Sequence, residues 1–199
     1  MIKHTGAILL LIATGANAAP RDPNWPCQQI KVPALSLASV WSGPPVDPTQ
    51  AAWKEDPQVA GLVAKLTLRR ENLDQAGALI HGFAQQAGGD MQPRLLNMLA
   101  GLYTVLDDER SAVIAGLDRF GGRQKELAAN LRADNEKLHA LQNDAGADPN
   151  TVQQMAQKVM WEAQVFQDRR QAISYACDAP TKIEQRLFAL ARLIQQELD

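Results

Sequence analysis

Few residues in this chain have side chains whose type and spacing could support chemistry. Glu136 and His139 stand three residues apart, a spacing that places a carboxylate and an imidazole on one face of a helix. Di-iron helical bundles use this Glu-x-x-His motif twice, together with two further glutamates. Here the motif occurs once, and the only other histidines are His4 and His81. We therefore predict no metal and no other cofactor, and interpret the motif as a solvent-exposed helix face.

The sequence lacks the local patterns of common enzyme classes. It contains no GxSxG nucleophile elbow, no HExxH zinc motif and no phosphate-binding P-loop. His81, between Ile80 and Phe83, could line a pocket, but a packed and hydrogen-bonded structural histidine is the simpler interpretation. We predict that the protein is not an enzyme. A bundle that binds a small ligand or a metal near His81 or His139 is the alternative.

The N-terminus predicts export. Residues 3–4 are basic, residues 7–13 form a short apolar run, and Ala16-Asn17-Ala18 is a small-x-small cleavage signal. This is the layout of a secretory signal peptide. We assign residues 1–19 to it, with cleavage after Ala18 or Ala19, and predict a periplasmic protein. The apolar run is shorter than the roughly 20 residues that span a bilayer, and no second apolar stretch is long enough to do so. We therefore expect no stable membrane insertion after cleavage, and an uncleaved anchor is the alternative.

The two cysteines are expected to pair in that compartment. Cys27 and Cys177 are the only cysteines of the chain, and an oxidising environment favours their oxidation. In the chain-entropy model, closing so long a loop stabilises the fold by about 4 kcal/mol or more. We predict a Cys27–Cys177 disulfide, and two buried free thiols are the alternative.

Composition favours an all-α fold and argues against a nucleic-acid partner. Ala, Leu and Gln are plentiful, which favours helix over strand, and 46% of the residues are hydrophobic, as in ordinary globular proteins. The formal net charge of −2 differs from the strongly basic balance of nucleic-acid-binding domains.

Residues 20–56 form a proline-rich block that also carries Trp25, Trp41 and Trp53. Proline lacks a backbone donor and disfavours helix, so the block is expected to be extended. A free linker has no need of three tryptophans. We predict a strap that lies on the body of the protein with the tryptophans as anchors, and a partly disordered leader is the alternative.

A helical domain is expected over residues 57–199. Asp56 is a good N-cap and Pro57 a good first residue for a helix over 57–66. A second helix is expected over 73–87, where a glycine pair ends it.

The third helix is expected to start near Asp90 and to run almost without interruption to the hairpin turn. Gly121-Gly122 lowers helix propensity, so a bend there is an alternative. The last helix is expected over about 181–198, capped by Thr181 and packed on the head of the domain.

Heptad spacing predicts an antiparallel coiled-coil hairpin over about 119–177. Residues 143–150 (NDAGADPN) form the turn, with Asn150 or Thr151 capping the returning helix. This fold pairs Leu138 with Met155 and places Gly116 beside Cys177, which leaves room for the strap. The apolar seam positions are Leu127, Leu131, Leu138 and Leu141 before the turn, and Val152, Val159, Phe166 and Ile173 after it.

Met160 and Trp161 point sideways or outward when Val159 lies in the seam. An exposed tryptophan is a plausible anchor for a partner protein, and its burial under the strap is the alternative. We therefore predict a non-catalytic, adaptor or chaperone-like periplasmic protein, whose partner is another periplasmic or envelope protein.

Overall fold

The computed structural model describes residues 22–199, and it is all-α, as the composition predicts. The predicted signal peptide, residues 1–19, lies outside the described residues. No strand occurs in residues 22–199. The elements in chain order are η1 (Leu37–Ser39), η2 (Ala51–Lys54), α1 (Pro57–Leu66), α2 (Leu73–Ala87), η3 (Gly88–Asp90), α3 (Met91–Asn143), α4 (Pro149–Cys177) and α5 (Ala179–Gln196).

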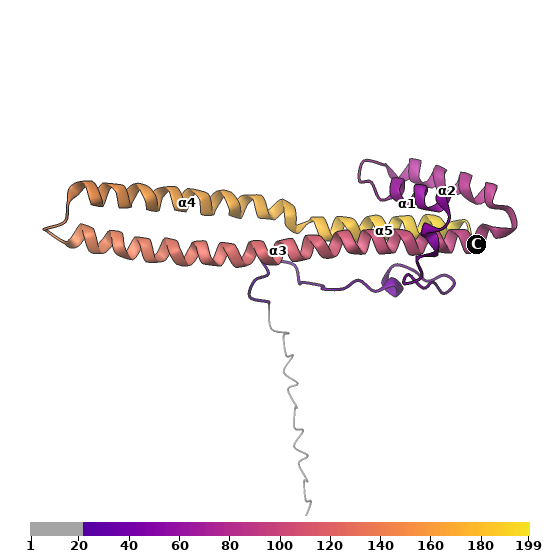
Figure 1. Ribbon diagram of the computed structural model, residues 1–199, viewed down its shortest axis with the longest axis horizontal. Helices are drawn as coiled ribbons and strands as arrows, with labels where there is room; N and C mark the ends of the chain where they lie inside the picture. Colours follow the sequence, from indigo (N-terminus) through magenta and orange to yellow (C-terminus); the bar gives the residue numbers. More distant parts are fainter. Residues whose placement is uncertain (1–21) are drawn as a thin grey trace, which may run out of the picture.

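The helix α3 is the axis of the molecule. It is continuous over 53 residues, which corresponds to a length of about 80 Å. The expected near-continuity is confirmed, and Gly121-Gly122 does not interrupt the helix. Helices α4 and α5 follow each other end to end and run back along α3, so that α4 accompanies its distal half and α5 its proximal half (Figure 1).

The first two helices begin and end where the local sequence predicts. The Asp56 carboxylate accepts hydrogen bonds from the backbone N–H groups of Gln58 and Val59, which satisfies donors that have no partner inside α1. The Asn72 side chain caps α2 in the same way. Gly88 ends α2 with a φ of 57°, a conformation that a residue without Cβ adopts at no steric cost.

Two predicted caps are wrong by a few residues. Asp148, not Asn150 or Thr151, caps α4, because its carboxylate accepts from both of those backbone N–H groups. Pro149 then takes the first helical position, where its missing N–H has no consequence. The last helix begins at Ala179 rather than at a Thr181 cap.

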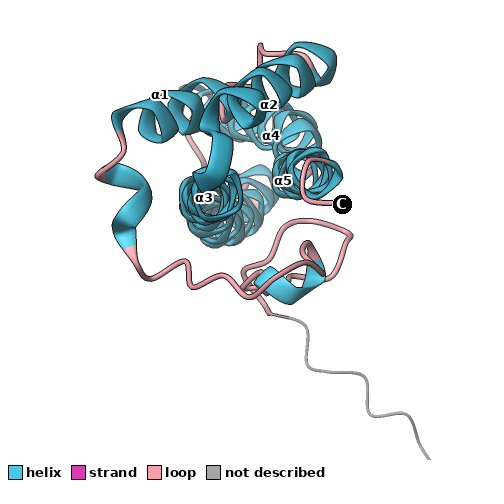
Figure 2. Ribbon diagram, turned by 90° about the vertical axis from the view of Figure 1, so that its right-hand side faces the viewer, coloured by secondary structure: helices cyan, strands magenta, loops and turns pink. Residues whose placement is uncertain are grey.

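The head has three layers around one core. Helices α1 and α2 cover one side of the α3–α5 pair, and the segment before α1 covers the opposite side (Figure 2). The core between these layers is made of aliphatic side chains spaced three and four residues apart on each helix. Its fully buried members include Val59, Leu66, Ile80, Leu95, Met98, Leu99, Leu102, Leu106, Leu187, Leu190 and Ile194.

Residues 22–56, which we call the strap, lie against the body. Val40 and Trp41 belong to the buried core, and Trp53 packs on it at the position of Gly101. A disulfide joins Cys27 to Cys177, with the two Cα atoms 5.6 Å apart. The predicted cysteine pairing is therefore present, and it fastens the strap where α4 meets α5.

The distal halves of α3 and α4 form the antiparallel hairpin. Leu138 and Val159 are its most deeply buried apolar side chains, each 8% exposed. Asp134 is 5% exposed within the seam, and its carboxylate accepts from Lys137 at 3.0 Å and from Lys158 at 2.6 Å. The predicted register pairs Asp134 with Val159, so the contact with Lys158 agrees with it to within one residue.

These hydrogen bonds set the electrostatics of the hairpin. Those from Lys158 and Lys137 hold the pKa of Asp134 below its usual 3.8. A charged residue that finds partners only in one register fixes that register.

Among helices of the described residues, none has a stretch long and apolar enough to cross a bilayer.

Candidate functional site

The outward side of α4 exposes three large side chains. Met160 is 72% exposed, Trp161 68% and Tyr175 83%. A helix turns about 100° per residue, so Trp161 points about 160° away from the seam residue Val159. The strap does not cover Trp161, so the alternative in which it buries this side chain is wrong.

The rest of this face carries almost no charge. We call it the outer face of α4, and Asp168 is its only charged member. All of its residues are exposed, and they recur three, four or seven residues apart: Asn150, Gln154, Gln157, Trp161, Gln164, Asp168 and Tyr175.

This composition is unusual for a solvated helix face. Charged residues are depleted, and aromatic residues and methionine are enriched, at the cores of protein–protein interfaces. The opposite side of the hairpin, on α3, presents the charged side chains Arg132 and Glu136 to solvent. The two sides of the hairpin therefore differ, and only the α4 side has the composition of a contact surface.

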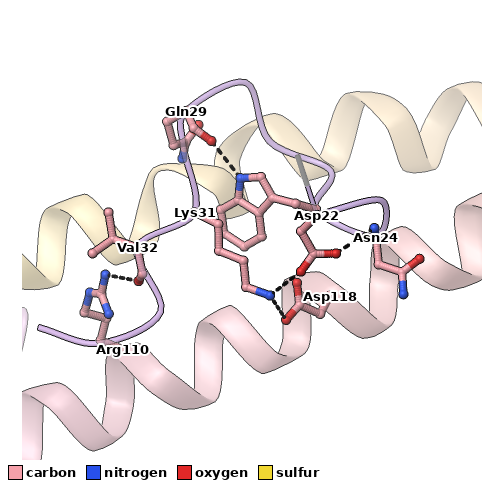
Figure 3. Close-up of polar contacts among 8 residues, drawn as sticks. Asp22, Asn24, Gln29, Lys31, Val32, Arg110 and Asp118 are labelled. Atoms are coloured by element: carbon pink, nitrogen blue, oxygen red, sulfur yellow. Dashed lines mark hydrogen bonds and ion pairs between the residues drawn. The ribbon is translucent and has the colours of Figure 1, made fainter. Parts of the chain in front are cut away.

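A polar row along α3 holds the strap. The Tyr103 hydroxyl donates to the carbonyl of Leu35, and the Arg110 guanidinium donates to the carbonyl of Val32 at 2.6 Å. Next to Val32, the ammonium group of Lys31 forms ion pairs with both Asp22 and Asp118 (Figure 3).

Lys31 forms two short ion pairs, one within the strap and one to α3. Its Nζ lies 2.6 Å from a carboxylate oxygen of Asp22 and 2.6 Å from one of Asp118. The hydrogen bonds to Asp118 and Asp22 raise the pKa of Lys31, and its bond to Asp22 lowers the pKa of that carboxyl. The extended strap is thus fixed through its own carbonyls and one shared cation, which explains how a chain without regular structure keeps one path.

Arg110 is the most deeply buried charge of the described residues. Its side chain is 1% exposed, and its Nε donates to Glu184 of α5 at 2.5 Å. It therefore links α3, α5 and the strap. Burial raises the pKa of the nearby Asp107 carboxyl, and the Arg110 charge opposes that shift.

The strap crosses α3 at Gly121. A Cβ at this position would lie 1.8 Å from the carbonyl oxygen of Asn24 and 3.3 Å from Cδ of Pro26. The sequence prediction that Gly116 makes room for the strap is wrong, because a Cβ at Gly116 would meet only the end of the Arg119 side chain. Sequence spacing identified the need for a small residue but placed it more than one turn too early.

His81 and His139, the two histidines of the described residues, belong to no cluster of metal-ligating side chains. His81 is exposed rather than packed, and it lies on the surface with Nδ1 3.1 Å from Glu197 and Nε2 2.9 Å from Gln85. Glu136 and His139 are both exposed. Within residues 22–199, no three or more His, Cys, Asp or Glu side chains gather closely enough to hold a metal ion.

Comparison with known proteins adds no family to this picture. No family model, curated protein or solved structure matches the chain. Two surfaces remain as candidates for function: the outer face of α4, and the strap with the helices beneath it.

Proposed function

We propose that the protein is a non-catalytic, adaptor or chaperone-like component of the periplasm that binds another envelope protein through the outer face of α4. The observation that carries this proposal is the exposure of Trp161 and Tyr175 on the outer face of α4, which has one charged residue, with the exposed Met160 next to it. Trp and Tyr are frequent among the few residues that supply most of the binding energy of an interface.

The shape of the molecule supports this role. The hairpin extends well beyond the head, so a partner can approach α4 without meeting α1, α2 or the strap (Figure 1). Helix α4 has 29 residues, and only Val159 and Cys177 are buried. A helix that buries so little of its own surface has most of it available for a second protein.

The proposed compartment has independent support. The Cys27–Cys177 disulfide is compatible with a periplasmic or extracellular location, because disulfides persist in oxidising compartments. The signal-peptide pattern of residues 1–19 agrees with export. Mass spectrometry of the protein recovered from the periplasm tests this part: the proposal expects a chain that starts at Ala19 or Pro20, and an intact N-terminus in the cytoplasm contradicts it.

Site-specific photocrosslinking in living cells tests the proposed surface. A photoreactive amino acid replaces Trp161 in one variant and Ala133 in a second. Both positions are exposed, and in the predicted register they lie at nearly the same level of the hairpin, on opposite helices. Because position 133 faces away from α4, it controls for random collisions.

We expect one crosslinked species of defined mass from position 161 and none from position 133. The same species from both positions, or no species from either, contradicts the proposal. The partner in the species is then identified by mass spectrometry. A mass equal to twice that of the chain would show that the outer face of α4 binds a second copy, which contradicts the proposed adaptor role.

A further inference from the structure

A cavity lies where the strap passes the base of the hairpin, on a different side from the outer face of α4. Its volume is about 300 Å³, and residues of the strap, α3 and α4 all line it. The apolar part of the lining includes Trp25, Ala128, Phe166 and Ile173. This size is at the lower end of the range for small-molecule sites, which are mostly apolar with a few fixed polar groups.

Two cations complete the lining. Lys125 of α3 and Arg170 of α4 face the cavity from the two arms of the hairpin, and neither takes part in an ion pair among the described residues. The acidic group whose pKa responds to Lys125 is Asp22, and its carboxylate is already bonded to Lys31 at 2.6 Å. Both cations are therefore free to bind an anion from outside.

The wall of the cavity also contains an unsatisfied polar atom. Oε1 of Gln124 is buried without a hydrogen-bond partner, while its Nε2 donates to the carbonyl of Phe166 at 3.4 Å. Buried acceptors in proteins are nearly always paired with a donor. An anionic head group only accepts hydrogen bonds, so the nature of an occupant is inferred from the apolar wall and the two cations and not from this atom.

We propose that this cavity binds an amphiphilic anion, a hydrocarbon chain with one carboxylate or phosphate head. The hydrocarbon packs on Trp25, Phe166 and Ile173, and the head lies between Lys125 and Arg170. An uncharged apolar ligand leaves both cations unused, and a small polar anion leaves the apolar wall unused. A molecule with both parts matches the apolar wall and the two cations together.

The site is independent of the proposed partner surface, because Trp161 and Tyr175 lie outside the lining. If no ligand binds in the cavity, the crosslinking result expected at position 161 is unaffected. If position 161 gives no crosslink, the ligand binding expected in the cavity is likewise unaffected. The ligand could be a free fatty acid or an anionic phospholipid, since both combine a hydrocarbon chain with an anionic head. Titration with decanoate detects the first, and sedimentation with vesicles detects the second.

Calorimetric titration of the purified, disulfide-bonded protein with decanoate tests the proposal, with decanol as the uncharged control. The variants are Lys125→Gln and Arg170→Gln. Arg169→Gln is the matched control, because Arg169 is the exposed neighbour of Arg170 and does not line the cavity. Thermal melts by circular dichroism check that all three variants fold, as expected for changes at exposed positions.

We expect decanoate to bind, and Lys125→Gln and Arg170→Gln each to weaken binding by about tenfold to a hundredfold, the range for hydrogen bonds to charged groups. Arg169→Gln is expected to change the affinity by less than about twofold, because it leaves the site intact. Decanol binding as tightly as decanoate, or equal losses for Arg169→Gln and Arg170→Gln, overturns the proposal.

A sedimentation assay distinguishes the source of the head group. Vesicles containing phosphatidylglycerol are compared with vesicles of phosphatidylcholine alone. Binding to the anionic vesicles that Arg170→Gln reduces and Arg169→Gln leaves intact supports the phospholipid form, even if decanoate does not bind. If neither decanoate nor anionic vesicles bind, the proposal is wrong.

Discussion

The crossing of the strap over α3 predicts opposite effects for the same substitution at two adjacent glycines. In a helix interior, alanine is about 1 kcal/mol more favourable than glycine. At Gly122 a new Cβ meets nothing within 4 Å, so Gly122→Ala is expected to raise the free energy of unfolding by up to about 1 kcal/mol. This variant is the matched control.

At Gly121 the same methyl group collides with the backbone of the strap. The Asn24 carbonyl oxygen would lie 1.8 Å away, whereas a carbon–oxygen contact needs about 3.3 Å, so the strap must retreat by about 1.5 Å. Overpacking of this kind costs about 1–3 kcal/mol. Both variants gain the same helix propensity, which therefore cancels in the comparison, so Gly121→Ala is expected to be about 1–3 kcal/mol less stable than Gly122→Ala.

Urea denaturation followed by circular dichroism measures both values. A second pair of measurements, in a chain with Cys27→Ser and Cys177→Ser, shows whether the strap is responsible. Without the disulfide the strap can move away from α3, so the difference between the two glycine variants is expected to shrink. Equal stabilisation by both alanines in the disulfide-bonded protein refutes the docking of the strap at Gly121.

Three further predictions concern single side chains. Arg110→Met removes a buried guanidinium and leaves the Glu184 carboxylate without its partner, so we expect the free energy of unfolding to fall by about 3–5 kcal/mol. Urea denaturation measures this change, and a decrease below about 1 kcal/mol contradicts the role of Arg110 in linking α3, α5 and the strap. Asp134→Asn is expected to destabilise the protein at pH 7. Because the folded-state pKa of Asp134 is depressed, the stabilisation by its carboxylate is present above pH 3.8 and disappears as the pH falls through the folded-state pKa. The melting temperatures of the wild-type protein and of Asp134→Asn are therefore expected to converge in acid. Trp161→Ala is expected to change the free energy of unfolding by less than about 0.5 kcal/mol, since the side chain is exposed, and a larger loss in the same assay shows a structural role instead.

Local sequence signals predicted the helices because the controlling physics is local. Asp56-Pro57 marks the start of α1, and Gly88 ends α2. Heptad spacing on both sides of the turn predicted the hairpin and a register that the Asp134–Lys158 contact matches to within one residue. The cap of α4 was misplaced because Asp148, Asn150 and Thr151 are all competent caps and differ only in their backbone geometry.

The docking of the strap could not be placed from the sequence, because it depends on contacts between residues far apart in the chain. Arg110 bonds to a carbonyl 78 residues earlier, and a carbonyl oxygen carries no signature of its residue type. A signal for the helix side did exist, since Tyr103, Arg110, Asp118 and Gly121 fall on one stripe of α3 at spacings of three, seven and eight residues.

The outer face of α4 could be predicted from the sequence, whereas the cavity beside the strap could not. Met160 and Trp161 could be assigned to the outside of the hairpin from heptad phase alone, and they are exposed. The cavity beside Lys125 and Arg170 could not be inferred, because the strap supplies one wall of it and the path of the strap was unknown. Surfaces made by one regular element follow from periodicity, and surfaces made by three separate segments need the tertiary structure.

The most direct test of the proposed function is a photocrosslinking scan along residues 150–175 in living cells. If the outer face of α4 binds a partner, crosslinking yields rise and fall with the helical period of about 3.6 residues. The maxima then fall at positions 150, 154, 157, 161, 164, 168, 172 and 175, and the minima at seam positions such as 159 and 166. Yields with no period, or with maxima on the flank of α4 that carries Arg169 and Arg170, contradict the proposal that this face is the contact surface.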